Sequence, residues 1–405
     1  MKWGRCVAGL ILSFFFTGLA RAQTGTEPTV SNSGTQLDLE RLLAARLADE
    51  ELREGWIRLF DGQTLMGWTP SDGANWHVVD NTIVATEGSN SLLCTSVPFS
   101  DYEVSLEFRA EQNTNSGVFL RTPLVPADPA RDCFELNIAP NDNPFPTGSL
   151  VFRKKRDDLA SDPAPKEWHN LKALVRGMHV TTWLDGVQTC DYQDTTNLKS
   201  GLIGLQFREG KIEFRDIKLR PLTEEVLVGK MDRFKPAVNV LADYDPAGAL
   251  TISGGRGHVE STFTFGDGVL QFSAETLAGN VNSGVFFRCI PGEDMNGYEC
   301  QLHHGYSDSR FKPVDSGSGA IFRRQAARAV LSDEGQVAHV VIVASGPRIS
   351  TWVQGVQVVE FVDTRKPDAN PRRGLRLEPG TLMLQGHDPE CKVRFHSIRV
   401  QSFPY

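Results

Sequence analysis

Apolar and polar residues alternate along most of the chain from residue 55 onward. In the segment 102–109 every even position is apolar and every odd position is polar. A period of two is typical of an antiparallel strand with one buried face. Similar short segments recur, separated by turn pairs such as Asp61-Gly62, Asp185-Gly186 and Pro291-Gly292. Many short strands joined by such turns predict an all-β sandwich rather than an α/β fold.

A different pattern precedes this region. Between residues 37 and 54, leucines recur at helical spacing with charged residues between them. This spacing predicts one short amphipathic helix that ends at Gly55. Residues 23–35 are rich in Thr, Ser, Gly and Pro and are expected to form a flexible leader.

The first 22 residues have the pattern of a secretory signal peptide. Lys2 and Arg5 precede an apolar run at 7–16, and small residues at 20 and 22 predict cleavage before Gln23. The apolar run is shorter than the roughly 18 residues that a membrane-spanning helix needs, and no later stretch approaches that length. We therefore expect a secreted or periplasmic protein without a membrane span.

The strand-rich region contains an internal repeat. The segment Asn115–Arg121 returns as Asn282–Arg288 with one substitution. The segment Thr182–Gln188 returns as Thr351–Gln357 in the same order. An ordered repeat of this length indicates duplication of a whole structural unit.

The repeat divides the chain into two modules. We expect one β-sandwich at 55–221, called copy one, and a second at 235–402, called copy two. A polar linker at 222–234 joins them. Two copies are too few for a solenoid, so each copy is interpreted as a globular module, and the two modules could pack on each other.

The charged residues of the chain indicate which kinds of molecule it is expected to bind. The formal net charge is −8. The densest basic cluster, Arg153–Arg156, is followed at once by Asp157 and Asp158. A nucleic-acid-binding protein usually carries a larger basic patch, so we expect no nucleic-acid partner.

An ordered run of motifs in copy one resembles one known family. The run comprises Gly55-Trp56, Leu59-Phe60-Asp61-Gly62, Gly67-Trp68, Glu107-Phe108-Arg109, Asn115 to Arg121, Trp183-Leu184-Asp185-Gly186 and Phe214-Arg215-Asp216-Ile217. It is similar to the 3-keto-disaccharide hydrolase domain family. The resemblance implies a concanavalin A-like or laminarinase-like jelly-roll sandwich, here in two tandem copies. It also implies cleavage of glycosides already oxidised at C3 of the sugar.

Copy two departs from the family pattern. It lacks the opening motifs but keeps Glu299-Cys300-Gln301, which resembles the Glu-x-Gln strand of the family better than Glu135-Leu136-Asn137 does. The family often has an Asp five residues after this Glu. Pro140 and His304 occupy that position here.

The candidate site residues follow from strand geometry, because alternate residues of a strand share a face. Carboxylate, amide and guanidinium groups on one face suit the many hydroxyls of a sugar. The alternative is an Arg–Glu pair that only stabilises the sheet. The candidate catalytic residues are Glu135, Glu299 and His303, and the candidate substrate-binding residues are Arg121, Asn137, Arg288 and Gln301.

Copy two has more polar side chains than copy one on its predicted ligand face. Glu299, Gln301 and His303 alternate on one predicted face, whereas copy one offers Glu135 and Asn137. The sequence therefore predicts that Glu299 contributes more to turnover than Glu135. His303 and Glu299 could also belong to a divalent-metal site, but the sequence identifies no cofactor.

The implied chemistry requires one base. A ketone at C3 acidifies the proton on C2, so a Glu or His can start elimination of the C1 substituent, and water can then add. An Arg could stabilise the developing enolate. The sequence lacks the paired-carboxylate signature of sandwich glucanases. The alternative is a non-catalytic, lectin-like carbohydrate-binding or adhesion module, and a third possibility is one active copy with a packing partner.

Two cysteines of copy two could form a cross-strand disulfide. Cys289 and Cys300 have the opposite parity to Arg288 and Glu299, so both are expected to point away from the ligand face. A hairpin register that places them opposite each other would bring the sulfurs together. The register cannot be read from the sequence.

Overall fold

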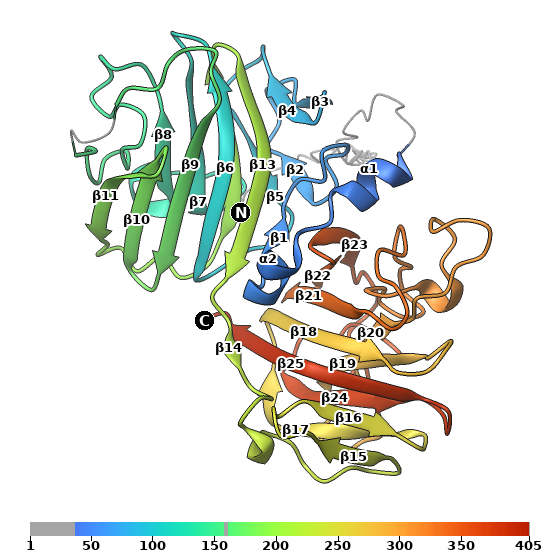
Figure 1. Ribbon diagram of the computed structural model, residues 1–405. Helices are drawn as coiled ribbons and strands as arrows, with labels where there is room; N and C mark the ends of the chain where they lie inside the picture. The colour runs from blue at the N-terminus through green and yellow to red at the C-terminus, as the bar shows by residue number, and fades with distance from the viewer. Residues whose placement is uncertain (1–36, 158–160, 405) are drawn as a thin grey trace, which may run out of the picture. The chain divides into compact units, whose positions relative to one another are not determined.

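The computed structural model describes residues 37–157 and 161–404, so the expected signal peptide lies outside the described residues. The described chain is almost entirely β-structure, arranged as two sandwiches of two antiparallel sheets each (Figure 1). This confirms the expected all-β fold with two modules. No helix in the described ranges is long and apolar enough to cross a membrane.

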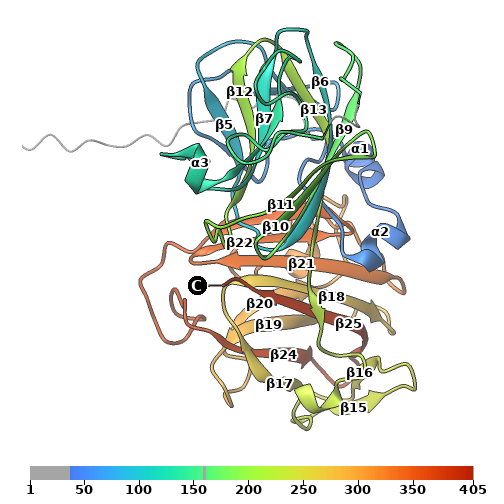
Figure 2. The ribbon, with the colours of Figure 1, turned by 90° about the vertical axis from the view of Figure 1, so that its left-hand side faces the viewer.

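Copy one packs an eight-stranded sheet on a five-stranded sheet. Across the larger sheet the order is β11 (Val187–Gln193), β10 (His179–Leu184), β9 (His169–Arg176), β6 (Tyr102–Ala110), β13 (Ile212–Pro221), β4 (Thr82–Ala85) and β3 (His77–Val79), and β1 (Ile57–Arg58) also pairs with β13. The smaller sheet has the order β2 (Trp68–Pro70), β5 (Ser91–Thr95), β12 (Leu202–Glu209), β7 (Asn115–Thr122) and β8 (Phe134–Ile138). Figure 2 shows β5, β12 and β7 side by side.

Copy two repeats this plan with one strand fewer in the smaller sheet. The larger sheet has the order β15 (Leu241–Tyr244), β16 (Leu250–Ser253), β25 (Lys392–Ser402), β18 (Gly268–Thr276), β21 (Val337–Ser345), β22 (Arg348–Val353) and β23 (Val356–Val362), and β14 (Glu224–Glu225) also pairs with β25. The smaller sheet has the order β17 (Gly257–Phe265), β24 (Gly380–Gly386), β19 (Ser283–Cys289) and β20 (Tyr298–Leu302). Strands β19, β20 and β24 are the counterparts of β7, β8 and β12.

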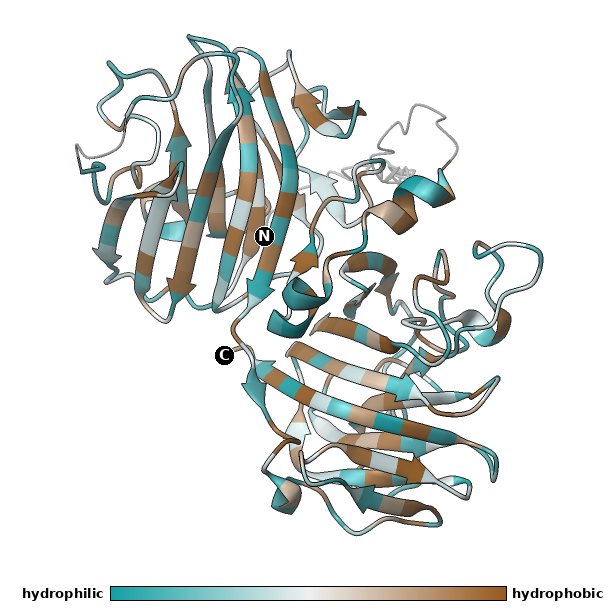
Figure 3. Cartoon of the chain, in the orientation of Figure 1, coloured by the Kyte–Doolittle hydropathy of each residue, from teal (hydrophilic) through white to brown (hydrophobic). Residues whose placement is uncertain are grey.

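The alternating apolar residues of the strands form the core of each sandwich. Along β6 and β13 hydrophobic and hydrophilic residues alternate (Figure 3). Val104, Leu106 and Phe108 of β6 are buried in the copy one core, whereas Ser105 and Glu107 between them are partly exposed. Burial of such side chains is the main favourable contribution to the stability of the sandwich.

The helix expected over 37–54 is instead two short helices, α1 (Leu39–Ala44) and α2 (Asp49–Glu54). The break lies at a buried contact with copy two. There the backbone N–H of Leu47 donates to the carbonyl of Gln354 at 3.1 Å, and the Leu47 side chain is buried. A continuous helix would use that N–H internally, so the tertiary contact overrides the helical pattern.

The remaining short helical segments of the described chain are α3 (Pro129–Asp132) and the 3-10 turns η1 (Met231–Arg233) and η2 (Val314–Ser316). The predicted linker at 222–234 contains η1 and β14, and β14 hydrogen-bonds to β25 of copy two. The linker therefore carries regular structure of its own.

Candidate functional site

The two candidate glutamates occupy equivalent positions on the smaller sheets. Glu135 on β8 lies opposite Phe119 on β7, and Glu299 on β20 lies opposite Phe286 on β19. The alternate residues of these strands, such as Leu136, belong to the sandwich core. Both glutamates therefore lie on the face of the smaller sheet that points away from the core. Their exposed fractions are 9% and 8%, so each carboxyl is largely shielded from water.

Burial changes the acidity of both carboxyls. It raises the pKa of Glu135 to about 7, against the opposing effects of the Arg208 charge and a hydrogen bond from Gln206. It raises the pKa of Glu299 to about 7 as well, against the charges of nearby cationic groups, foremost Arg372. A carboxyl with a pKa close to neutral pH can accept and return a proton, which is the property of a general acid–base group.

The repeated glycine on the strand next to each glutamate, β7 or β19, makes room for the carboxyl. A Cβ placed on Gly117 would lie 3.4 Å from Cγ and 3.5 Å from Oε1 of Glu135. The corresponding distances between Gly284 and Glu299 are 3.3 and 3.4 Å. The glutamate side chain therefore lies over the glycine.

Copy one has an open pocket around its glutamate. The pocket measures about 460 Å³. Its polar lining includes Asn115, Glu135, Asn137, Gln206 and Arg208. The carbonyl Oε1 of Gln206 is buried without a hydrogen-bond partner among the described residues. An unsatisfied acceptor of this kind can accept from a ligand hydroxyl.

One wall of this pocket is aromatic. The rings of Phe145 and Phe152 meet edge to face with their centroids 5.9 Å apart. Phe152 is 68% exposed, although a large apolar side chain is usually covered. The amide Nδ2 of Asn137 donates to the Phe145 carbonyl, which links the wall to the polar floor. An apolar wall beside polar groups suits a sugar ring.

The same face of copy two carries a methionine where copy one has a glycine. Gly204 of β12 lies opposite Phe119, whereas Met383 of β24 takes that place opposite Phe286. Met383 is completely buried and packs with Phe286 and Met295. In copy one a Cβ placed on Gly204 would lie 3.1 Å from Sγ of Cys94 and 3.3 Å from Cβ of Phe119, so neighbouring side chains border this glycine, whereas copy two places the Met383 side chain there.

Two of the other polar candidates of copy two lie near Asp315, Gln301 through hydrogen bonds and His303 through a longer contact. Gln301 donates to Asn282 Oδ1 at 3.2 Å, and Asn282 donates to Asp315 at 3.2 Å. His303 Nε2 lies 4.0 Å from Asp315, and its Nδ1 accepts from the backbone N–H of Gly305. The structure thus brings Gln301 and His303 together. Within the described ranges no group of three or more His, Cys, Asp or Glu residues could hold a metal ion.

The geometric expectation for the two arginines is wrong. Arg121 and Arg288 lie on strands next to those of the glutamates, but their φ angles of 51° and 50° interrupt the alternation of faces. Both side chains are buried. Arg121 forms an ion pair with Asp101 at 2.8 Å, and Arg288 forms one with Asp267 at 2.6 Å. Neither guanidinium is paired with a candidate glutamate, so both arginines secure loops of their own sandwich.

The left-handed backbone of Arg288 also explains why Cys289 and Cys300 do not form a disulfide. Cys289 and Cys300 are both free and buried. Cys300 lies opposite Val285 and belongs to the core, whereas Cys289 packs with Phe286 on the other face. The expected disulfide is therefore absent, and the expectation that both sulfurs share a face is wrong.

Sequence reasoning missed the aromatic wall of the copy one pocket, Phe145 and Phe152, and two of its polar residues, Gln206 and Arg208. The repeat contained a signal for Gln206. Gln206 and Gln385 occupy the same place in the paired strands β12 and β24, each following a buried leucine. An extended comparison of the two copies would have found this pair, but nothing in the sequence placed Arg208 beside Glu135.

Comparison with known proteins gives one family and several solved structures. The model of the 3-keto-alpha-glucoside-1,2-lyase-like domain matches residues 55–220 and 232–401. A proposed glycosyl hydrolase from Parabacteroides distasonis is 21% identical over 44% of this chain and 99% of that chain, with a TM-score of 0.39. The carbohydrate-binding module CBM66 from Bacillus subtilis is 17% identical over 38% and 94%, with a TM-score of 0.31. No curated protein matches the chain.

Proposed function

Because the chain belongs to the 3-keto-alpha-glucoside-1,2-lyase-like family, we propose that copy one cleaves glycosides whose sugar carries a ketone at C3. The family supports a carbohydrate-related function for both modules. The choice of copy one rests on Glu135. This buried carboxyl has a pKa near neutral pH and lies in an open pocket of about 460 Å³.

The proposed reaction is a base-initiated elimination. The Glu135 carboxylate removes the proton on C2, and the electrons of that C–H bond form the enolate with the C3 ketone. The enolate then collapses to a C1=C2 double bond and expels the C1 oxygen substituent, which takes up a proton. Water can add to C1 and a proton to C2, which completes a net hydrolysis. A single positioned base contributes about 10²–10⁴ in rate.

Four neighbours of Glu135 fit supporting roles. The guanidinium of Arg208 already acts on the Glu135 carboxyl, and its positive charge would stabilise the developing enolate oxygen. Gln206 and Asn137 supply amide groups that would orient the ring hydroxyls. Phe152 would cover one face of the sugar.

Release of a chromophore tests the proposal. The full chain is incubated with 4-nitrophenyl 3-keto-α-glucoside, and the same glucoside without the ketone serves as the control. We expect nitrophenol from the keto compound alone, because only its C2 proton is acidified. Release from both compounds would contradict elimination and favour an ordinary glycosidase.

A carbohydrate-binding module is the second candidate function. The observation that favours it is the aromatic wall of Phe145 and Phe152, which binding alone would explain. Saturable binding of the 3-keto-glucoside without any release of nitrophenol would decide for this alternative.

The pH dependence of turnover should follow Glu135. Because the base must be ionised, kcat/KM should rise with pH through about 7 and level off above it. Arg208→Gln removes the charge that favours the carboxylate, so the midpoint of the rise should move to higher pH. Initial rates across the neutral range measure both midpoints. A profile that is flat through pH 7 would exclude Glu135 as the base.

A further inference from the structure

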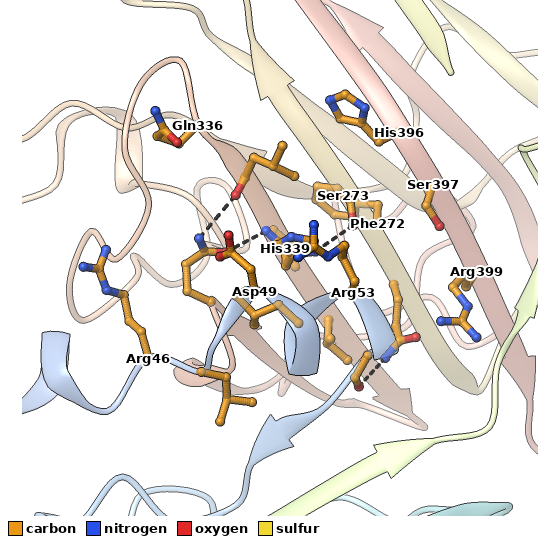
Figure 4. Close-up of a pocket in the computed structure, with 18 of the residues that line it drawn as sticks. Arg46, Asp49, Arg53, Phe272, Ser273, Gln336, His339, His396, Ser397 and Arg399 are labelled. Atoms are coloured by element: carbon orange, nitrogen blue, oxygen red, sulfur yellow. Dashed lines mark hydrogen bonds between the residues drawn. The ribbon is translucent and has the colours of Figure 1, made fainter. Parts of the chain in front are cut away.

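A second pocket, of about 780 Å³, lies between helix α2 and the outer face of the larger sheet of copy two (Figure 4). Three adjacent strands contribute a row of polar side chains to it. Ser273 on β18 lies opposite Ser397 on β25 and His339 on β21, and Gln271 lies opposite Arg399. The pocket is therefore built on regular strand positions.

The polar side chains on the floor of this pocket form hydrogen bonds with other groups of the protein. Gln271 donates to the carbonyl of Gly55 at 2.9 Å and accepts from the Thr223 hydroxyl at 2.7 Å. The Nδ1 atom of His339 lies 2.8 Å from the Ser273 hydroxyl. These bonds fix the shape of the floor before any ligand arrives.

Two guanidinium groups of the pocket form no ion pair with an acidic side chain among the described residues. Arg53 on α2 forms no hydrogen bond or ion pair within the described part of the chain. Arg399 reaches only two backbone carbonyls, at 3.5 and 3.4 Å. Asp333 does not neutralise them, because Arg310 and Arg46 already bind its carboxylate. Figure 4 shows Arg53 of α2 beside His339 of β21, and Arg399 on β25, which β18 separates from β21.

We propose that this pocket binds a sugar that carries a carboxylate, with Arg53 and Arg399 as the anion-binding groups. A guanidinium presents a planar pair of donors that matches a carboxylate. The two arginines come from different elements, α2 and β25, so an anion between them would contact both sides of the pocket.

The remaining lining favours a sugar over a simple anion. The volume of about 780 Å³ is typical of sites for whole organic ligands, which span roughly 300–1,000 Å³. Asp49 and Gln336 add hydrogen-bonding groups that suit hydroxyls, whereas Ser397 already donates to Glu225 and His396 lies 3.2 Å from Glu275. Burial lowers the pKa of His339 to about 4, so its imidazole is neutral and can also serve a hydroxyl.

Titration calorimetry of the full chain with glucuronate tests this site, with glucose and sulfate as comparison ligands. We expect glucuronate to bind more tightly than either. Arg53→Gln and Arg399→Gln should each weaken it by about tenfold or more, since each removes hydrogen bonds to a charged group. Arg348→Gln is the matched control, because Arg348 is exposed and does not line the pocket.

Each outcome has a definite meaning. Loss of glucuronate binding in both pocket variants, with the control unchanged, supports the proposal. Equal affinity for sulfate would show a site for simple anions and would overturn the recognition of a sugar. No glucuronate binding, or binding that both variants leave intact, would overturn the site itself. The release assay with the 3-keto-glucoside is independent of all three results.

Discussion

Glu135→Gln is expected to lower kcat for a 3-keto-α-glucoside by about a hundredfold or more, with little change in folding. The amide keeps the shape of the side chain and its place over Gly117 but cannot accept the C2 proton. Glu135 is buried and forms no ion pair among the described residues, and the charge of Arg208 is the electrostatic effect that its replacement would leave unopposed. Single-turnover kinetics and thermal unfolding of the same preparation measure the two effects separately.

Glu299→Gln is the matched control for that experiment. Its carboxyl has the same surroundings in kind, with a glycine beneath it and a pKa of about 7. Phe286 and Met383 pack together on the sheet face that carries this carboxyl, whereas Glu135 lines a pocket of about 460 Å³. We therefore expect Glu299→Gln to retain most of the activity. A larger loss in Glu299→Gln than in Glu135→Gln would assign the reaction to copy two, as the sequence alone predicted.

The pH dependence of folding stability gives a second test of Glu135. A buried carboxyl with a raised pKa loses its stabilising contribution as the pH rises, whereas an ion-paired carboxylate loses it as the pH falls. Burial raises the pKa of Glu135 from 4.5 to about 7 in the folded protein. The folded state therefore binds this proton more tightly than the unfolded state does. The resulting stabilisation is complete below about pH 4.5 and is lost as the pH rises through about 7. Above that pH, Glu135→Gln should make the protein no less stable than the wild type.

The sequence predicted the sandwich architecture because the alternation of residues reports directly which face of a strand is buried. The repeat predicted two modules for a similar reason, since both copies must satisfy the same packing. The glutamates were found in this way, because Glu135 and Glu299 keep regular strand positions.

The other features of the site could not be predicted from the sequence, because they depend on departures from regular strand geometry. A single residue with a left-handed backbone, Arg121 or Arg288, changes the side of the sheet on which it and the next side chain of the strand lie. The pocket wall is a loop contact between Phe145 and Phe152, which no periodicity reports. The packing of the same face in copy two depends on Met383, whose neighbours Phe286 and Met295 come from other parts of the chain.

Arg288→Ala is expected to lower the free energy of unfolding of the protein by about 3–5 kcal/mol. The Arg288 side chain is completely buried, and its guanidinium binds Asp267 at 2.6 Å. It also donates to the carbonyls of Gly346 at 2.8 Å and Arg376 at 3.2 Å. Alanine would leave these acceptors without their donor and Asp267 without its countercharge, and it would not relieve the left-handed backbone.

Urea denaturation of the Arg288 variant beside Arg256→Ala measures this effect. Arg256 is an exposed arginine of the same module, and its loss should change the unfolding midpoint little. Arg288→Lys should lie between the two, because lysine keeps the charge but loses the fork that reaches several acceptors at once. If Arg288 were instead a ligand-binding group, Arg288→Ala would weaken sugar binding and leave the midpoint unchanged. The buried loop contacts of Arg288 argue for the loss of stability, since a guanidinium bound to Asp267 and two carbonyls has few donors left for a sugar.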